Sequence, residues 1–256
     1  MIQNLLKNKV LFWLGSVHLL VCLILTFYGF FNDVAVLGIN SMIKPIKFAL
    51  SIWIYSWTMA LILNYVADVR KVKVYAWVAV VCMSFEQIAI TFQAAKGELS
   101  HFNHTTTFGM VLFSLMGVFI LTITLWTAYI TTVFIKQKSY DLPPAVVLSI
   151  KIGLIFFVVF SLFGGYISGL EGHTVGSADG SQGLWFLNWS MLYGDLRVAH
   201  FFGIHSLQIV PLFGIAVSTY FDNSKTTKFV KIFALIYSIF IFVTLVQGFF
   251  GLPFIK

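Results

Sequence analysis

Residues 10–31 read VLFWLGSVHLLVCLILTFYGFF, without a single Asp, Glu, Lys or Arg. An α-helix rises about 1.5 Å per residue, so a helix of this length crosses the roughly 30 Å of hydrocarbon in a bilayer. Six further stretches share this length and apolar character: 48–66, 74–95, 108–135, 145–170, 198–220 and 229–250. The sequence therefore predicts an all-α, polytopic integral membrane protein with seven transmembrane helices, for which the lipid bilayer is the solvent.

The composition of the whole chain agrees with this prediction. Of the 256 residues, 59% are apolar and only 10% are charged, whereas soluble domains carry about 25% charged residues. The breaks between the apolar stretches are short and polar or contain helix breakers, such as Pro143-Pro144. We therefore expect a single seven-span membrane domain over residues 1–256. The same composition excludes a disordered chain and a secreted disulfide scaffold.

The basic residues predict the orientation in the membrane. Ten of them fall on the side of the N-terminus: Lys7, Lys9, Arg70, Lys71, Lys73, Lys136, Lys138, Lys225, Lys228 and Lys231. Five fall on the other side: Lys44, Lys47, Lys96, Arg197 and Lys256. Basic residues near spans favour the cytoplasm, so we expect a cytoplasmic N-terminus and an external C-terminus. The net charge of +7 is then a topology signal that requires no nucleic acid. We expect the cell membrane as location, in a bacterium the cytoplasmic membrane.

Known classes of seven-span proteins differ from this chain. Rhodopsins and G-protein-coupled receptors have an external N-terminus, and Lys231 stands only at the start of the last span, away from the position of a retinal lysine. In architecture the chain is similar to the ceramidase and adiponectin-receptor superfamily of membrane zinc hydrolases. That resemblance would assign site roles to Ser100, His101 and Asp195. Residues 229–250 lack the HxxxH pair of that superfamily, so its activity is not carried over.

Ionisable residues inside spans are the best indicators of function, because each costs about 3 kcal/mol at the bilayer centre. Glu86 lies in the third span, about ten residues from its outer end and so roughly 15 Å deep. Gln93, seven positions further on, falls on the same helical face. We predict Glu86 as a catalytic base or metal ligand and Gln93 as a substrate-binding residue.

The sixth span opens with the most polar stretch of any span, DLRVAHFFGIHSLQIVP over residues 195–211. Four polar side chains spread over about 140° of this helix: Arg197, His200, His205 and Gln208. So wide a polar arc cannot face lipid, and it must therefore face protein or water. We predict Arg197 as a charge-stabilising catalytic group and Gln208 and Asp195 as substrate-binding residues. Asp195 is also the expected N-cap of the helix.

Histidines concentrate on the predicted outer side. His101 and His104 precede the fourth span, and they would share one helical face if Ser100 were the N-cap. Together with His200 and His205 they could ligate zinc, iron or copper, or two of them could hold a haem. This predicts a polar pocket walled by the third, fourth and sixth spans.

Three functional hypotheses follow. The first is a metal- or haem-binding membrane enzyme or redox protein that acts on a lipid or small lipophile. The second is a small-solute or proton-coupled transporter whose spans are arranged as three, one and three, although the first and last three spans share no visible repeated sequence. The third is a non-catalytic accessory membrane subunit. A hydrogen-bonded polar core without metal also fits, because the histidine spacing matches no diagnostic signature.

Further features concern ligands and partners. The long external loop 171–197 is expected either to lie on the headgroups or to cover the pocket as a lid. Gly165 and Gly169 form a GxxxG pair, to which Gly164 adds, that would let another helix approach, within the bundle or in an oligomer. Lys44 and Lys47, at the outer start of the second span, either extend to the interface or attract an anionic substrate or headgroup.

Overall fold

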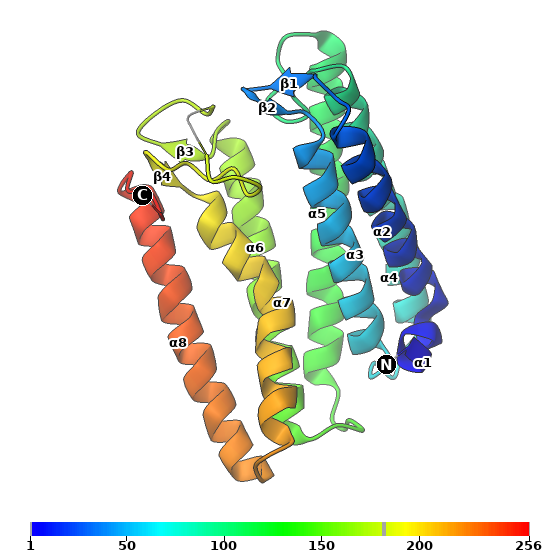
Figure 1. Cartoon of the computed structure of the whole chain (residues 1–256). Helices are drawn as coiled ribbons and strands as arrows, with labels where there is room; N and C mark the ends of the chain where they lie inside the picture. The colour runs from blue at the N-terminus through cyan, green and yellow to red at the C-terminus, as the bar shows by residue number, and fades with distance from the viewer. Residues whose placement is uncertain (1, 181–182, 256) are drawn as a thin grey trace. The chain divides into compact units, whose positions relative to one another are not determined.

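The structure is a computed structural model that describes residues 2–180 and 183–255. Within these ranges seven helices are long and apolar enough to cross a membrane: α2 (Lys9–Gly29), α3 (Ile43–Leu63), α4 (Val69–Ala95), α5 (Thr107–Lys136), α6 (Pro144–Gly169), α7 (Arg197–Ser218) and α8 (Asn223–Phe249). A short helix α1 (Ile2–Leu5) and a 3-10 turn η1 (Leu6–Asn8) precede α2 (Figure 1). The predicted all-α, multi-pass architecture is confirmed.

Three helices begin more than one turn before their predicted starts. These are α3, α4 and α8, whose first turns carry several lysines and so interrupt the apolar runs. Long basic side chains extend toward the headgroups while their stems stay in apolar surroundings, so a basic first turn can continue a membrane helix. The apolar run therefore marks only the part of each helix that is expected in the hydrocarbon core. The helix itself begins before that run.

The chain divides into two compact units, Met1–Ile130 and Thr131–Lys256. In unit 1, α2 packs along α3, and α4 contacts both of these helices. In unit 2, α6 packs along α7, and α8 contacts both of these. Most of α5 belongs to unit 1, and its last residues belong to unit 2.

Each unit contains a small β-hairpin between its first two long helices. In unit 1, β1 (Ala35–Val36) pairs antiparallel with β2 (Ile39–Asn40). In unit 2, β3 (Thr174–Val175) pairs antiparallel with β4 (Gly194–Asp195). Two-residue strands leave no periodic signal in a sequence, so these hairpins were not predicted. The element order helix, hairpin, helix, helix thus occurs twice.

The two hairpins end in the same hydrogen bonds, just before the helix that follows each of them. The backbone N–H of Ser41 donates to the Val34 carbonyl at 2.9 Å, and the N–H of Leu196 donates to the His173 carbonyl at 3.0 Å. The second strand then ends on a side chain that accepts from the backbone two residues further on. Asn40 Oδ1 accepts from Met42 N at 2.9 Å, and Asp195 Oδ1 accepts from Arg197 N at 3.0 Å. The strand pairing and the bonds around it are repeated in detail.

The starts of α4 and α8 repeat as well. Both helices have 27 residues, and each is capped by an Asp whose side chain accepts from the backbone N–H three residues later. Asp68 accepts from Lys71 at 3.1 Å, and Asp222 accepts from Lys225 at 3.0 Å. The first and last three spans share no visible repeated sequence, yet these hairpins and caps occur in both units.

The units differ in how their hairpins are closed. Two residues join β1 to β2, Leu37 and Gly38, both with positive φ (49° and 77°). This backbone matches the tight turns that fit the twist of a hairpin. Residues 176–193 join β3 to β4 instead, and they form most of the predicted long loop.

Close packing of α6 on α7 depends on glycines outside the Gly165–Gly169 pair, one of them Gly164, which was predicted to add to that pair. A Cβ added to Gly153 would lie 2.8 Å from the Ser206 carbonyl oxygen, and one added to Gly164 would lie 2.5 Å from His200 Cε1. Among the described atoms, none lies within 4 Å of a Cβ added to Gly165 or Gly169. The predicted GxxxG pair therefore takes no part in close packing within unit 2.

Candidate functional site

Glu86 is the central polar residue of unit 1. It is 1% exposed, and within the described residues neither of its carboxylate oxygens has a hydrogen-bond partner. It interacts electrostatically with Lys44, which lies in the first turn of α3. A buried carboxylate without donors is costly unless a charge partner, a proton or a ligand compensates it. Of these three, the structure shows a charge partner, Lys44.

The packing of α4 explains how Glu86 comes to face the interior. The buried positions of α4 recur every three or four residues and include Ala79, Cys82, Glu86 and Gln93. Small residues on this stripe let neighbouring helices approach closely. Glu86 and Gln93 therefore share the buried face, as predicted from their spacing.

Gln87 fixes α4 to the start of α3. Its Nε2 donates to the Pro45 carbonyl at 3.3 Å and to Thr91 Oγ1 at 3.0 Å. Pro45 and Gln87 directly follow Lys44 and Glu86 in the sequence, so this bond between the helices holds the two charged residues near each other. Sequence reasoning gave Lys44 only a minor role, because a lysine at a helix start usually extends to the headgroups.

His101 belongs to the same region of unit 1. Its ring packs against Phe48 of α3 and Phe113 of α5, with centroid distances of 6.1 and 5.6 Å. Its Nδ1 lies 3.2 Å from Ser100 Oγ. Burial, followed by the charge of Lys44, holds the pKa of His101 well below its usual value. His101 is therefore a neutral imidazole at neutral pH.

The predicted helical pairing of His101 with His104 is wrong. Residues 100–106 form a loop, α5 begins at Thr107, and Thr106 Oγ1 rather than Ser100 accepts from a first-turn backbone N–H, that of Gly109, at 3.0 Å. His101 is half-buried and His104 is exposed. The loop contains the buried Asn103, and the helix begins only after it, at Thr107.

Gln93 positions this loop. It is fully buried, and its Nε2 donates to the Leu99 carbonyl at 3.2 Å. The backbone N–H of Glu98 also donates to the Gln93 carbonyl at 2.9 Å. Gln93 thus connects the end of α4 to the segment that carries His101. Its predicted substrate-binding role stays a prediction.

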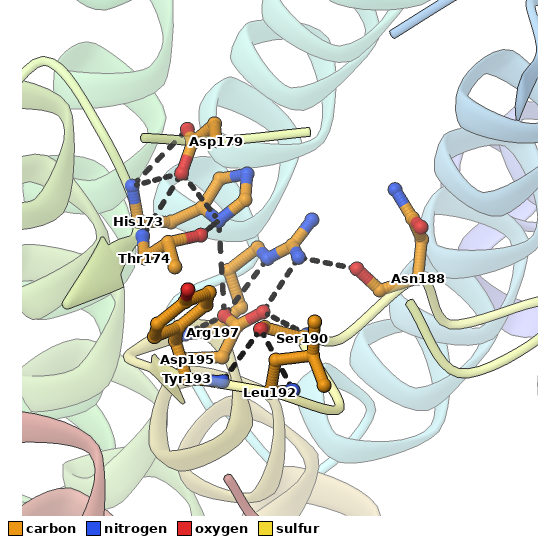
Figure 2. A network of polar contacts seen from close by, with 9 residues as sticks. All are labelled: His173, Thr174, Asp179, Asn188, Ser190, Leu192, Tyr193, Asp195 and Arg197. Atoms are coloured by element: carbon orange, nitrogen blue, oxygen red, sulfur yellow. Dashed lines mark hydrogen bonds and ion pairs between the residues drawn. The ribbon is translucent and has the colours of Figure 1, made fainter. Parts of the chain in front are cut away.

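Unit 2 contains a second polar network, shown in Figure 2. Asp195 is 2% exposed and receives two side-chain hydrogen bonds from Arg197, Nε to Oδ1 at 2.9 Å and Nη2 to Oδ2 at 2.6 Å. Oδ2 also accepts from the backbone N–H of Ser190 at 2.9 Å. Burial opposes ionisation of Asp195, but the hydrogen bonds and charge of Arg197 outweigh it and lower the pKa of Asp195.

The network fastens the long loop to the start of α7. Arg197 Nη2 also donates to the Asn188 carbonyl, and His173 Nδ1 lies 3.2 Å from Asp179 and 3.9 Å from Asp195 (Figure 2). Asp195 was predicted to be the N-cap residue of α7. It precedes the cap position, which is Leu196. The predicted catalytic role of Arg197 and substrate-binding role of Asp195 stay predictions, and the two side chains bind each other.

The loop also packs against unit 2 through Trp189, which is 6% exposed. The Trp189 ring meets Phe201 at 5.3 Å and Phe254 at 5.8 Å between centroids. An aromatic side chain buried in this way adds substantial apolar contact area. Trp189 therefore anchors the loop to its own unit. The two predicted roles of the loop, on the headgroups or as a lid, both stay predictions.

The remaining predicted residues of α7 have protein partners. His200 Nδ1 lies 2.7 Å from the Phe160 carbonyl oxygen. Because a carbonyl only accepts, Nδ1 carries the proton, and Nε2 is the ring nitrogen with a lone pair. His205 packs edge-on against Phe201 at 4.2 Å and interacts with the side chain of Gln208.

A protein-ligated metal centre gains no support. Among residues 2–180 and 183–255, no group of three or more His, Cys, Asp or Glu side chains is placed to hold a metal ion. Each unit supplies two of the four predicted ligands, His101 and His104 from unit 1 and His200 and His205 from unit 2.

Comparison with known proteins gives no relative: no family model, no curated protein and no solved structure matches the chain. The functional argument therefore depends on the two units and their polar residues. Sequence reasoning missed Ser190, Asn188 and His173, which hold the loop. A carboxylate and an arginine two residues apart at a helix start were the available signal for such an anchor.

Proposed function

We propose that the protein is a proton-coupled membrane transporter of a small anionic solute, in which Glu86 carries the proton and Lys44 binds the anion. The single observation that carries the proposal is the buried Glu86 carboxylate, which within the described residues has no hydrogen-bond donor and interacts with Lys44. Buried acidic residues in membrane helices commonly serve as proton-relay or substrate groups.

The charges suggest how proton and anion would be coupled. While Glu86 is ionised, Lys44 is its counter-charge. When Glu86 takes a proton, Lys44 becomes available for an anionic solute, and one proton with one monoanion crosses without net charge. Lys47, three residues further along α3, and the positive end of the helix dipole add to the attraction of an anion.

The repeated architecture supports a transporter independently of these charges. Transporters commonly contain internal repeats that surround the substrate path. Here three long helices in each set, α2 to α4 and α6 to α8, share the same strand pairing and an Asp cap on the third helix. One further helix, α5, lies between the two sets in the chain. The polar residues are not repeated: Glu86 and Lys44 belong to unit 1, and Arg197 and His200 belong to unit 2.

Proteoliposome uptake tests the proposal. Purified protein would be reconstituted and given a panel of ¹⁴C-labelled monocarboxylates and ³²P-phosphate, with the outside more acidic than the lumen. We expect uptake of at least one anion at about ten times the rate in empty liposomes, and dependence on the pH gradient. Glu86→Gln should abolish the gradient dependence, and Lys44→Gln should abolish uptake.

Glu98→Gln is the matched control, because Glu98 is an acidic residue of the same unit that pairs with Lys96 at 2.6 Å near the surface. It should transport like the wild type. Wild-type protein that takes up none of these anions, or a Glu86→Gln variant that retains gradient-driven uptake, overturns the proposal.

A second candidate is the metal- or haem-binding enzyme or redox protein acting on a lipid or small lipophile. The observation in its favour is the His200 tautomer, since metal-binding histidines usually donate their other ring N–H to a carbonyl or carboxylate. An absorbance spectrum and elemental analysis of protein purified without added metal test it. A Soret band, or stoichiometric zinc, iron or copper that is lost in His200→Ala, would favour it over transport. A protein with neither cofactor nor uptake would be an accessory subunit.

A further inference from the structure

A basic groove lies in unit 2 at the turn from α5 to α6. It has a volume of about 480 Å³. Its polar lining consists of Gln137, Lys138, Ser139, Tyr140 and Lys151, and its apolar lining consists of Leu142, Pro144, Val147 and Leu148. The groove therefore has a polar, cationic part and an apolar part.

The polar part is held by contacts to the end of α5. Lys151 Nζ donates to the Ile135 carbonyl at 3.4 Å and lies 5.3 Å from the centre of the Tyr140 ring. The Tyr140 hydroxyl donates to the Phe134 carbonyl. The Phe134 carbonyl also accepts from the backbone N–H of Gln137 at 3.3 Å, so Tyr140 adds a second bond there, while Lys151 supplies a donor for the Ile135 carbonyl. These contacts keep the Lys151 ammonium beside the groove.

The charge of this region is positive. Lys138 and Lys151 line the groove, Lys136 is in the last turn of α5, and Asp141 is the acidic residue of the connecting turn. The turn lies at the ends of two membrane helices, on the face that the basic residues predict to be cytoplasmic. Basic pockets between membrane helices on that face suit anionic headgroups.

We propose that this groove binds an anionic phospholipid. The phosphate lies between the ammonium groups of Lys138 and Lys151, and the first part of an acyl chain lies along Leu142 and Leu148. Charge complementarity favours an anionic lipid over a zwitterionic one, and the apolar wall favours a lipid over free phosphate. This site is separate from Glu86 and does not depend on transport.

Native mass spectrometry of the full chain in detergent tests the site, with phosphatidylglycerol and phosphatidylcholine as probes. We expect phosphatidylglycerol to bind at least ten times more tightly than phosphatidylcholine. The double variant Lys138→Gln/Lys151→Gln should lose this preference. Lys225→Gln/Lys228→Gln removes the same charge at the start of α8 on the same predicted face, and it should retain the preference.

Two further arms keep the result interpretable. Lys138→Gln alone removes an exposed side chain without affecting the α5 carbonyls, and it should weaken phosphatidylglycerol binding about threefold even if the double variant folds poorly. Inorganic phosphate at millimolar concentration should not displace the lipid. Equal binding of the two lipids, an equal loss in the control variant, or displacement by phosphate overturns the proposal.

Discussion

Gln93 and Gln247 occupy matching places in the two units and make the same hydrogen bond. The side-chain Nε2 of each donates to the carbonyl oxygen six residues further on, that of Leu99 at 3.2 Å and that of Pro253 at 2.6 Å. Each glutamine is followed four residues later by a glycine with a φ of 71°. That conformation suits glycine, and it turns the chain back over the helix end. A glutamine and a glycine four residues apart thus form a shared helix terminus.

We expect these two glutamines to contribute equally to stability. Gln93→Leu and Gln247→Leu each remove one side-chain hydrogen bond to a buried or half-buried carbonyl, so each should lower the free energy of unfolding by about 1–2 kcal/mol. Denaturant unfolding in detergent, followed by tryptophan fluorescence, measures this. Gln3→Leu, at an exposed position in α1, serves as the control and should change little. A large effect at only one of the two glutamines would show that the repeat is not energetically equivalent.

The two adjacent glycines of α6 should respond oppositely to a methyl group. Gly164→Ala places a Cβ 2.5 Å from His200 Cε1, so a helix or the imidazole must shift, at a cost of about 1–3 kcal/mol. Gly165→Ala meets none of the described atoms within 4 Å, and removing a helical glycine should stabilise the fold by about 0.5–1 kcal/mol. Thermal unfolding of the two variants compares them directly. Equal effects would contradict the packing of His200 on Gly164.

The Asp195–Arg197 pair should protect the long loop from proteolysis. The folded-state pKa of Asp195 is lowered, so its stabilising effect is complete above the ordinary aspartate pKa of about 3.9 and is lost as the pH falls through the lower folded value. Asp195→Asn leaves Arg197 without its buried counter-charge and should cost about 3–5 kcal/mol. Limited proteolysis within 176–193 should be faster in this variant at pH 7. Cleavage at the wild-type rate would mean that Trp189 alone secures the loop.

His101 should also make stability fall on acidification, but beginning at a higher pH than for Asp195. Its folded-state pKa lies below the ordinary value of about 6.5, so the unfolded chain binds the proton more readily. The free energy of unfolding should therefore fall as the pH drops below 6.5, by up to about 1.4 kcal/mol per pH unit until the folded-state pKa is reached. Unfolding at pH 7.5 and 5.5 should show a smaller difference in His101→Asn than in the wild type. His104→Asn, at an exposed position, is the control and should retain the wild-type difference.

The orientation can be tested with single cysteines at exposed positions. A membrane-impermeant maleimide should label Ser177→Cys in intact cells, because loop 171–197 is predicted to be external. Ser224→Cys, at the start of α8, should be labelled only after permeabilisation. Cys22 and Cys82 are buried and should contribute little background. The reverse labelling pattern would invert the predicted topology.

Much of the fold could be predicted from hydrophobicity, because lipid selects apolar helices of nearly fixed length. The depth of Glu86 and its shared face with Gln93 follow from helix geometry alone. The interaction of Lys44 with Glu86 could not be predicted, because it needs the start of α3 packed beside this part of α4, as in the hydrogen bond from Gln87 to the Pro45 carbonyl. The partners of Asp195 could not be predicted either. They come from a loop, and a loop has no sequence periodicity from which its shape could be predicted.

Unit 1 closes its hairpin with the dipeptide Leu37-Gly38, so the common scaffold does not need residues 176–193. Closing a longer loop costs conformational entropy, and ordering each residue costs about 1–2 kcal/mol more. The Asp195–Arg197 pair and Trp189 offset part of that cost without adding a helix or a strand. A segment that is dispensable to the scaffold and yet anchored this firmly is a natural place for selection to have acted on something other than stability. It is also the place where the two hairpins, alike in their strand pairing, differ.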